Sequence, residues 1–188
     1  MKTLNFILIM TVLTLSTNIN AKPVSVIKNA KSLIVETSGW KSEKVLVQIK
    51  DLSGAIILDE IILKSASARK YNLINLPDGQ YSIEMSSDLK ITTRNFEVNG
   101  KEINLSTDIQ TIYKPVVIWT DQTLDINLLT LGKRAVINIV DGRNNTILSQ
   151  KHNTSALHKR YNISALPEGD YTVNVEMNGR SFYFNYTK

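Results

Sequence analysis

The chain contains two histidines, His152 and His158, which lie six residues apart in a polar stretch. A zinc site needs three or four ligands, most often cysteine or histidine. The chain has no cysteine, and no cluster of carboxylates stands at ligand spacing near either histidine. We therefore expect both histidines to be solvated side chains in a loop between strands, and we predict no metal site.

Serine and carboxylate chemistry also lacks its usual context. No Gly-x-Ser-x-Gly elbow occurs, and the sequence contains neither a glycine-rich phosphate loop nor an EF-hand loop. Asp51 and Asp141 end two similar strand-like segments just before turn residues, which predicts that they cap turns. Calcium held by a few loop acids stays an open alternative. The sequence predicts a non-catalytic protein without a cofactor, with a hydrolase that uses His152 or His158 as a remote alternative.

Residues 1–21 have the pattern of a secretory signal peptide. Lys2 precedes an apolar run over residues 6–15, and Ala21 provides the small residue at the expected cleavage site. The run is too short to span a membrane, which takes about 20 apolar residues. We expect an exported mature protein with no membrane insertion after cleavage, in the periplasm, at the cell surface or outside the cell. The absence of cysteine favours a bacterial source.

The charge of the chain is modestly positive. The formal net charge is +5, and it falls to +4 when Lys2 leaves with the signal peptide. Basic residues are scattered among acids, whereas a nucleic-acid footprint would gather them on one face. We predict no nucleic-acid partner and leave open an anionic surface or glycan.

An internal repeat organises everything after the signal peptide. Residues 71–81 recur as residues 161–171 without a gap, and the same offset aligns 44–51 with 134–141. The repeated corner residues are Leu76, Pro77, Gly79 and Tyr81, then Leu166, Pro167, Gly169 and Tyr171. Lys-Pro-Val triplets at residues 22–24 and 114–116 mark the two module starts, with a linker near 106–114. The sequence therefore predicts a first module over residues 22–111 and a second over 112–188.

Each predicted module is built from short strands. Large apolar residues recur with period two over 45–50, 81–86, 137–139 and 171–177, and no segment keeps a helical period over three turns. The Asn-Gly pairs at 99–100 and 178–179 predict two-residue hairpins of type I′. Many short strands separated by such turns favour an all-β fold of two tandem immunoglobulin-like Greek-key sandwiches, with a closed barrel as the competing architecture.

The repeated corner has a physical interpretation. Pro77 would fix φ at the first position of a turn, and Gly79 would supply a left-handed residue. Tyr81 would then place its ring in the core and send its hydroxyl back to the upstream backbone, and Tyr171 would do the same in the second copy. This role is structural.

Aromatic residues give one candidate surface. Phe182, Phe184 and Tyr186 share one face of the predicted last strand, and Tyr183 lies on the other. Trp40 and Trp119 stand near strand ends. Such faces stack sugars or cover interfaces, but packing of the core is the simpler interpretation.

The run Tyr-Asn-Leu-x-x-Leu-Pro-x-Gly-x-Tyr-x-Ile resembles the E-to-F corner of immunoglobulin-like and fibronectin type III modules. It is also similar to the C-terminal sorting domains of type IX secretion cargo and to short exported bacterial Ig-like proteins of unknown function. The first resemblance implies a binding, adhesion or structural role at the cell envelope, with an unknown protein or glycan partner reached through loops or a sheet edge. The second implies a C-terminal secretion signal, although the large cargo domain that normally precedes such a signal is missing.

Overall fold

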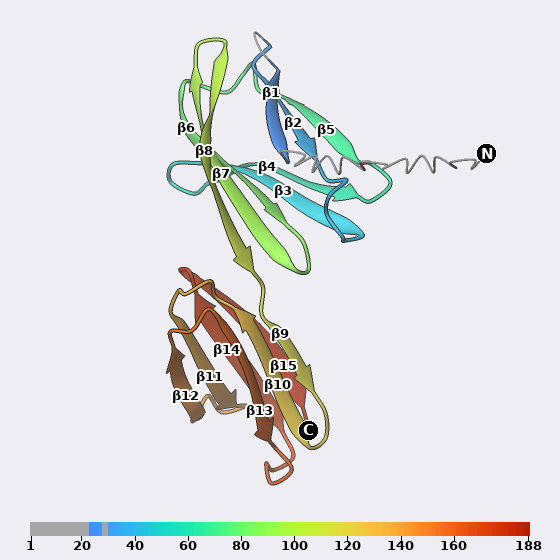
Figure 1. Cartoon of the computed structure of the whole chain (residues 1–188), viewed down its shortest axis with the longest axis vertical. Coiled ribbons are helices and arrows are strands. Elements are labelled where there is room, and N and C mark those ends of the chain that lie inside the picture. The colour runs from blue at the N-terminus through green and yellow to red at the C-terminus, as the bar shows by residue number, and fades with distance from the viewer. Residues whose placement is uncertain (1–22, 28–29) are drawn as a thin grey trace, which may run out of the picture.

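The computed structural model describes residues 23–27 and 30–188, and the predicted signal peptide lies outside this part of the chain. The described residues form β-strands, turns and loops with no helix, so no helix among them could cross a membrane. Figure 1 shows two modules placed end to end, joined by a single connection. The prediction of an all-β chain is confirmed.

The first module packs a three-stranded sheet, β1-β2-β5, against a five-stranded sheet, β4-β3-β6-β7-β8. All neighbouring strands in it are antiparallel. Its strands are β1 Val24–Ile27, β2 Ser32–Glu36, β3 Lys44–Asp51, β4 Ile56–Leu63, β5 Ala68–Asn72, β6 Gly79–Ser86, β7 Lys90–Asn99 and β8 Glu102–Tyr113. Leu33 and Val35 of one sheet meet Val47 and Ile49 of the other in a closed core. Each such fully buried aliphatic side chain contributes about 1.5 to 3 kcal/mol.

The second module repeats this plan with one strand fewer. Sheet β9-β10-β13 packs against sheet β12-β11-β14-β15. Its strands are β9 Val116–Trp119, β10 Thr123–Leu129, β11 Ala135–Asp141, β12 Thr146–His152, β13 Ala156–Asn162, β14 Asp170–Met177 and β15 Arg180–Thr187. Leu124 and Ile126 pack on Ile137, Val173 and Val175. Two open sheets with crossovers between them form a Greek-key sandwich rather than a barrel, so the predicted fold class is confirmed.

The repeat extends to local irregularities. The pairing of β3 with β4 shifts register after Ile49, and the pairing of β11 with β12 shifts after Ile139. In the turn that follows, Gly54 and Asn144 occupy equivalent positions with φ of 87° and 62°. Asparagine tolerates this left-handed conformation better than most other non-glycine residues, so this position of the second turn does not need glycine.

The strand pairing corrects the alignment at the module starts. The Lys-Pro-Val triplets equate Val24 with Val116, but Val24 is buried and Val116 is exposed. Val117 takes the place facing the second core. A shift of one residue along a strand moves a side chain to the opposite face, so the triplets mark where the strands begin and not their register.

One hairpin prediction also needs correction. Asn178 and Gly179 both have positive φ and separate the paired residues Met177 and Arg180, as a type I′ turn requires. In the first module Asn99 pairs with Glu102, so the turn residues are Gly100 and Lys101. Of these two, Gly100 has positive φ. A single positive φ at the first turn position is the pattern of type II′, one residue later than predicted.

The stretch predicted to be a polar linker is strand. Residues 106–113 belong to β8; after a bulge that follows Leu105, residues 109–113 pair with β7 as far as Lys90 and Tyr113. The strand therefore runs two residues past the boundary expected after residue 111, and Lys114 with Pro115 makes the connection to β9. Backbone pairing with β7 outweighs the polar composition of this segment.

Candidate functional site

The repeated corner lies at the start of β6 and β14. The Tyr81 hydroxyl donates to the carbonyl oxygen of Pro77 at 2.8 Å, and that of Tyr171 donates to Pro167 at 2.7 Å. Leu76 and Leu166 pack at the edges of the two cores. The residues therefore hold each corner closed, and their contacts in the structure are structural ones.

The turn at this corner differs from the expected one. The backbone hydrogen bond closes from Leu76 N to Leu73 O at 2.9 Å, before Pro77 rather than around it. Gly79 and Gly169 have φ of 155° and 150°, an extended conformation with positive φ and not the left-handed helical one. This region is open essentially to glycine alone, so glycine is still required at this position. The predicted left-handed conformation of Gly79 is wrong.

A lysine stabilises each corner from a different part of the chain. Lys31, in the loop between β1 and β2, donates its ammonium to Leu76 O at 2.7 Å. In the second module Lys188 donates to Leu166 O at 2.6 Å and to Ile163 O at 3.0 Å. No sequence pattern indicated that both corners bind a lysine, because the two lysines are not related by the repeat offset.

Asp51 and Asp141 cap turns, as predicted. The Asp51 carboxylate accepts hydrogen bonds from the backbone amides of Ser53 and Ala55, and Asp141 accepts them from Arg143 and Asn145. The side chain of Ser53 lowers the pKa of the Asp51 carboxyl, with the Ala55 amide adding to the effect against a small cost of burial. The two carboxylates belong to separate modules and do not form a pair.

The histidines do not lie in a loop, which corrects the prediction. His152 ends β12 and His158 lies within β13. His152 Nε2 is buried without a hydrogen-bond partner among the described residues. His158 is exposed and places Nε2 3.2 Å from the Asp125 carboxylate. Within residues 23–27 and 30–188, no group of three or more potential ligands is close enough to hold a metal ion.

Asp125 organises the outer face of sheet β9-β10-β13. Arg160 donates two hydrogen bonds to its carboxylate, at 2.7 and 3.0 Å. These bonds lower the pKa of the Asp125 carboxyl despite its partial burial, and His158 adds a smaller effect in the same direction. The cross-strand pairs Asp125–Arg160 and Asn127–His158 account for the arrangement, since paired residues on antiparallel strands share one face. The ion pair is a structural feature of this sheet.

A second ionic cluster joins the two modules. Arg180, at the start of β15, donates to both carboxylate oxygens of Glu84 in β6, and Lys50 Nζ lies 3.3 Å from the same carboxylate. Glu84 is 7% exposed, which is unusual for a glutamate. Burial raises the pKa of its carboxyl, but the hydrogen bonds and charges of Arg180 and Lys50 outweigh that effect and keep the pKa below its usual range.

This contact predicts that acid loosens the junction. A carboxyl whose pKa is depressed by folded-state contacts stabilises them above its ordinary pKa, about 4.3 for glutamate, and the stabilisation is lost as pH falls through the folded value. Small-angle scattering should therefore show a wider range of inter-module distances below about pH 4 than at pH 7. Glu84→Gln should show the wider range already at pH 7. A variant that matches the wild type at both pH values would contradict this role.

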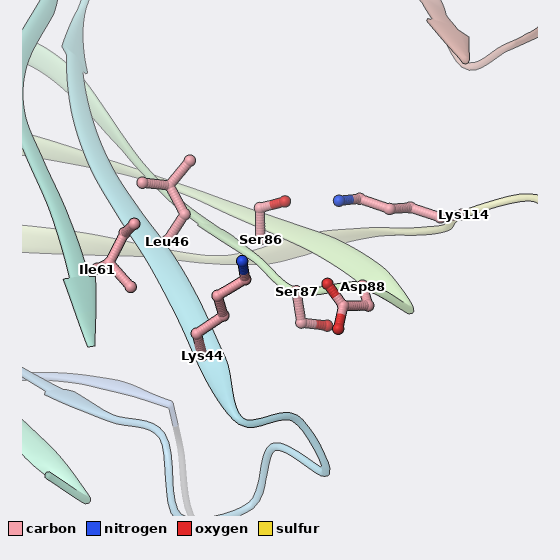
Figure 2. Close-up of a pocket in the computed structure, with 7 residues that line it drawn as sticks. All are labelled: Lys44, Leu46, Ile61, Ser86, Ser87, Asp88 and Lys114. Carbon is pink, nitrogen blue, oxygen red and sulfur yellow. The ribbon is translucent and has the colours of Figure 1, made fainter. Parts of the chain in front are cut away.

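A shallow cavity of about 250 Å³ opens beside this junction. Figure 2 shows the residues that line it: Lys44, Leu46, Ile61, Ser86, Ser87, Asp88 and Lys114. Leu46 and Ile61 are directly paired across β3 and β4, and Ser86 pairs with Leu46 from the other side. The cavity floor is therefore the outer face of the five-stranded sheet, and Lys114 of the inter-module connection forms one wall.

The charges of this cavity are unbalanced. Lys44 and Lys114 contribute two ammonium groups and Asp88 one carboxylate. No carboxylate of the described residues lies within the 4.0 Å of a salt bridge from either ammonium. Burial lowers the pKa of Lys114 and Arg180 adds repulsion, while Asp88 and Glu84 offset part of these effects. An anionic group in the cavity would relieve this repulsion.

The aromatic residues pack the second core. Phe182, Phe184 and Tyr186 lie against it as the simpler interpretation predicted, and Tyr183 on the opposite face is 66% exposed. Trp119 stacks on Tyr186 with ring centroids 4.6 Å apart and planes 4° apart. In the first module Trp40 is buried, and the Lys90 ammonium lies 4.4 Å from its ring centroid.

No protein-family model matches the chain, and no curated protein matches its sequence. Among solved structures, a two-domain fibronectin type III segment of chicken tenascin is 11% identical over 88% of this chain and 96% of its own, with a TM-score of 0.33. The BSP domain of a biofilm-associated protein is 14% identical over 84% of this chain, with a TM-score of 0.29, and the match spans 27% of that protein. A marsupial T cell receptor is 12% identical over 84% of this chain and 57% of its own, with a TM-score of 0.30.

Similarities with TM-scores this low do not indicate a function. The fold rests on the strand order and pairing described above, which make the chain two tandem Ig-like, fibronectin type III-like modules.

Proposed function

We propose that this protein is an exported, non-catalytic binding protein of the bacterial cell envelope, and that the cavity at the module junction binds an acidic sugar of an envelope glycan. The observation that carries the proposal is the pair of lysines, Lys44 and Lys114, which face this cavity without a salt-bridge partner among the described residues. Binding sites occur preferentially where domains meet.

The chemistry of the cavity suits one sugar ring with a carboxylate. Leu46 and Ile61 offer an aliphatic surface for the apolar face of a ring, and Ser86, Ser87 and Asp88 offer hydroxyl and carboxylate partners for its hydroxyl groups. Lysine ammonium groups attract an anion as point charges. A partner protein that presents an acidic side chain is the alternative occupant of the same cavity.

A fixed junction would hold the walls of the cavity in place for binding. The cavity walls come from the first module and from the connection, and the Glu84–Arg180 contact holds the second module beside them. Pre-organised walls reduce the ordering cost of binding. Acid that loosens the junction would then weaken binding as well.

An array of acidic and neutral oligosaccharides, with acidic proteins spotted beside them and probed with the mature protein, tests the proposal. We expect retention of uronic-acid oligomers that decreases with added salt, and at least about 10-fold weaker retention by Lys44→Glu or Lys114→Glu, which corresponds to about 1.4 kcal/mol. Lys151→Glu is the matched control, because it makes the same charge change on exposed β12 of the second module. Equal retention by the control and the cavity variants would refute the site, and retention of acidic proteins alone would favour the protein partner.

The alternative function, a type IX secretion signal in the last module, needs a different test. Deleting residues 181–188 would remove almost all of β15 and the Lys188 contacts, so lost secretion could reflect misfolding. A solvent-facing change such as Tyr183→Ala leaves the core contacts intact. Secretion that depends on exposed residues of β15 in a folded protein would support this alternative over the envelope binding protein.

A further inference from the structure

The two modules differ at one sheet edge. In the first module β7 is covered by β8, which pairs along its outer side. In the second module β15 takes the place of β7 in the repeat and is the outermost strand of its sheet among the described residues. The same fold thus shows one edge occupied by an added strand and the equivalent edge open.

Strand β8 shows what an added strand does at this edge. Leu105 pairs with Phe96 and Ile103 pairs with Val98, and both β7 side chains are only 1% exposed. Arg94 fixes the added strand by donating to Ser106 O at 2.7 Å and to Val24 O of β1 at 2.9 Å. The edge therefore accepts a strand that has apolar side chains at alternate positions.

The open edge leaves comparable side chains partly uncovered. Tyr186 is the counterpart of Phe96, because each pairs with the corner tyrosine of its own module. Phe96 is buried, whereas Tyr186, Phe182 and Phe184 are only half-buried. The stacked Trp119 covers one side of Tyr186 and leaves the backbone edge of β15 unpaired.

The open edge also lacks the charges that guard other edges. Residues 181–187 contain no charged residue, no proline and no glycine. Among the outer strands, β4, β5, β8, β12 and β13 each carry charged residues. The outer strands β1 and β9 are also uncharged, but each has only four residues. Charged side chains on edge strands oppose pairing with another chain, so residues 181–187 are the longest stretch of outer strand among the described residues that is suited to such pairing.

We propose that β15 pairs antiparallel with β15 of a second copy of this chain and forms a two-fold symmetric dimer. A two-fold axis brings identical strands together, so each surface must complement itself. The uncharged stretch meets that condition, with Tyr183 opposite either Tyr183 or Asn185 of the second copy. Both registers keep Phe182, Phe184 and Tyr186 on one face, where they cover each other as Ile103 and Leu105 cover β7.

Sedimentation velocity of the mature protein over a wide concentration series tests the dimer. One strand pair buries less surface than the roughly 1,200 Å² of a stable interface, so we expect a dimer fraction that rises with concentration. In the dimer, amide hydrogen exchange of residues 181–187 should slow as concentration rises. A monomer throughout the series, or unchanged exchange in β15, would overturn the proposal.

The double variant Tyr183→Lys and Asn185→Lys locates the interface. It sets lysines against lysines in either register while it leaves the core-facing residues unchanged, so the dissociation constant should rise at least about 10-fold with the fold retained. Ile61→Lys on β4 and Ile118→Lys on β9 make single lysine substitutions at exposed apolar positions elsewhere and should leave dimerisation unchanged. Loss of the dimer in either control and not in the double variant would place the interface elsewhere and refute the proposal.

Discussion

A chain that ends at Tyr113 is expected to fold cooperatively as one module, whereas a chain that ends at Lys101 is expected to lose most of its stability. The shorter chain lacks β8, so it loses Ile103 and Leu105 and uncovers Phe96 and Val98. Each of these side chains contributes up to about 1.5 to 3 kcal/mol by burial, and small domains are stable by only about 5 to 15 kcal/mol. Thermal unfolding followed by circular dichroism would compare the two chains.

The loss of stability should come from the apolar half of β8. A chain that ends at Asp108 retains Ile103, Leu105 and the Ser106 carbonyl that binds Arg94, so it is expected to keep most of the stability of the longer chain. If the chain ending at Lys101 unfolded at the same temperature as the one ending at Tyr113, β8 would be an appendage and not part of the first module. The comparison with β15 would then lose its basis.

Period-two alternation and the repeat together were sufficient to predict the sandwich. Val45, Val47 and Ile49 recur at every second position and are all buried, and Ala135, Ile137 and Ile139 are buried in the same way. The pattern works because successive side chains of a strand point to opposite faces. The strands could therefore be predicted from the local sequence, and the two modules from the repeat.

The errors arise where contacts distant in sequence decide the structure. Residues 106–113 are mostly polar, but they form strand because β7 supplies partners for residues 109–113 beyond a bulge after Leu105. Asp125 and Arg160 are 35 residues apart, and pairing of β10 with β13 brings them together. No spacing rule within one element predicts such a pair, since its geometry depends on strand register.

The junction was the least predictable part of the molecule. Glu84 and Arg180 are 96 residues apart and belong to different modules. The sequence contained no signal for this contact, because Glu84 alternates with the buried Ile83 and Met85 and so occupies an ordinary outward-facing position of its strand. Its burial results from the second module, whose placement beside β6 no local pattern predicts.

The two corner tyrosines are expected to differ in their contribution to stability, although the same motif produces both. Tyr171 is 5% exposed and its hydrogen bond to Pro167 O is partly buried, so Tyr171→Phe leaves this carbonyl less open to water than Pro77 O and should cost about 1 kcal/mol. Tyr81 is half-buried, and water can reach the Pro77 carbonyl once the hydroxyl is gone. Tyr81→Phe should therefore cost less, and denaturant unfolding of both variants would measure the difference.

The alanine variants separate the hydroxyl from the ring. Tyr171→Ala removes both the hydrogen bond and a buried aromatic side chain, and large-to-small changes of that kind cost about 3 to 5 kcal/mol. If Tyr171→Phe were as damaging as Tyr171→Ala, the hydrogen bond would dominate the corner. If Tyr171→Phe were neutral, the ring would account for the whole effect. An intermediate loss at Tyr171, larger than at Tyr81, is expected, because burial sets the cost of leaving a polar group unpaired.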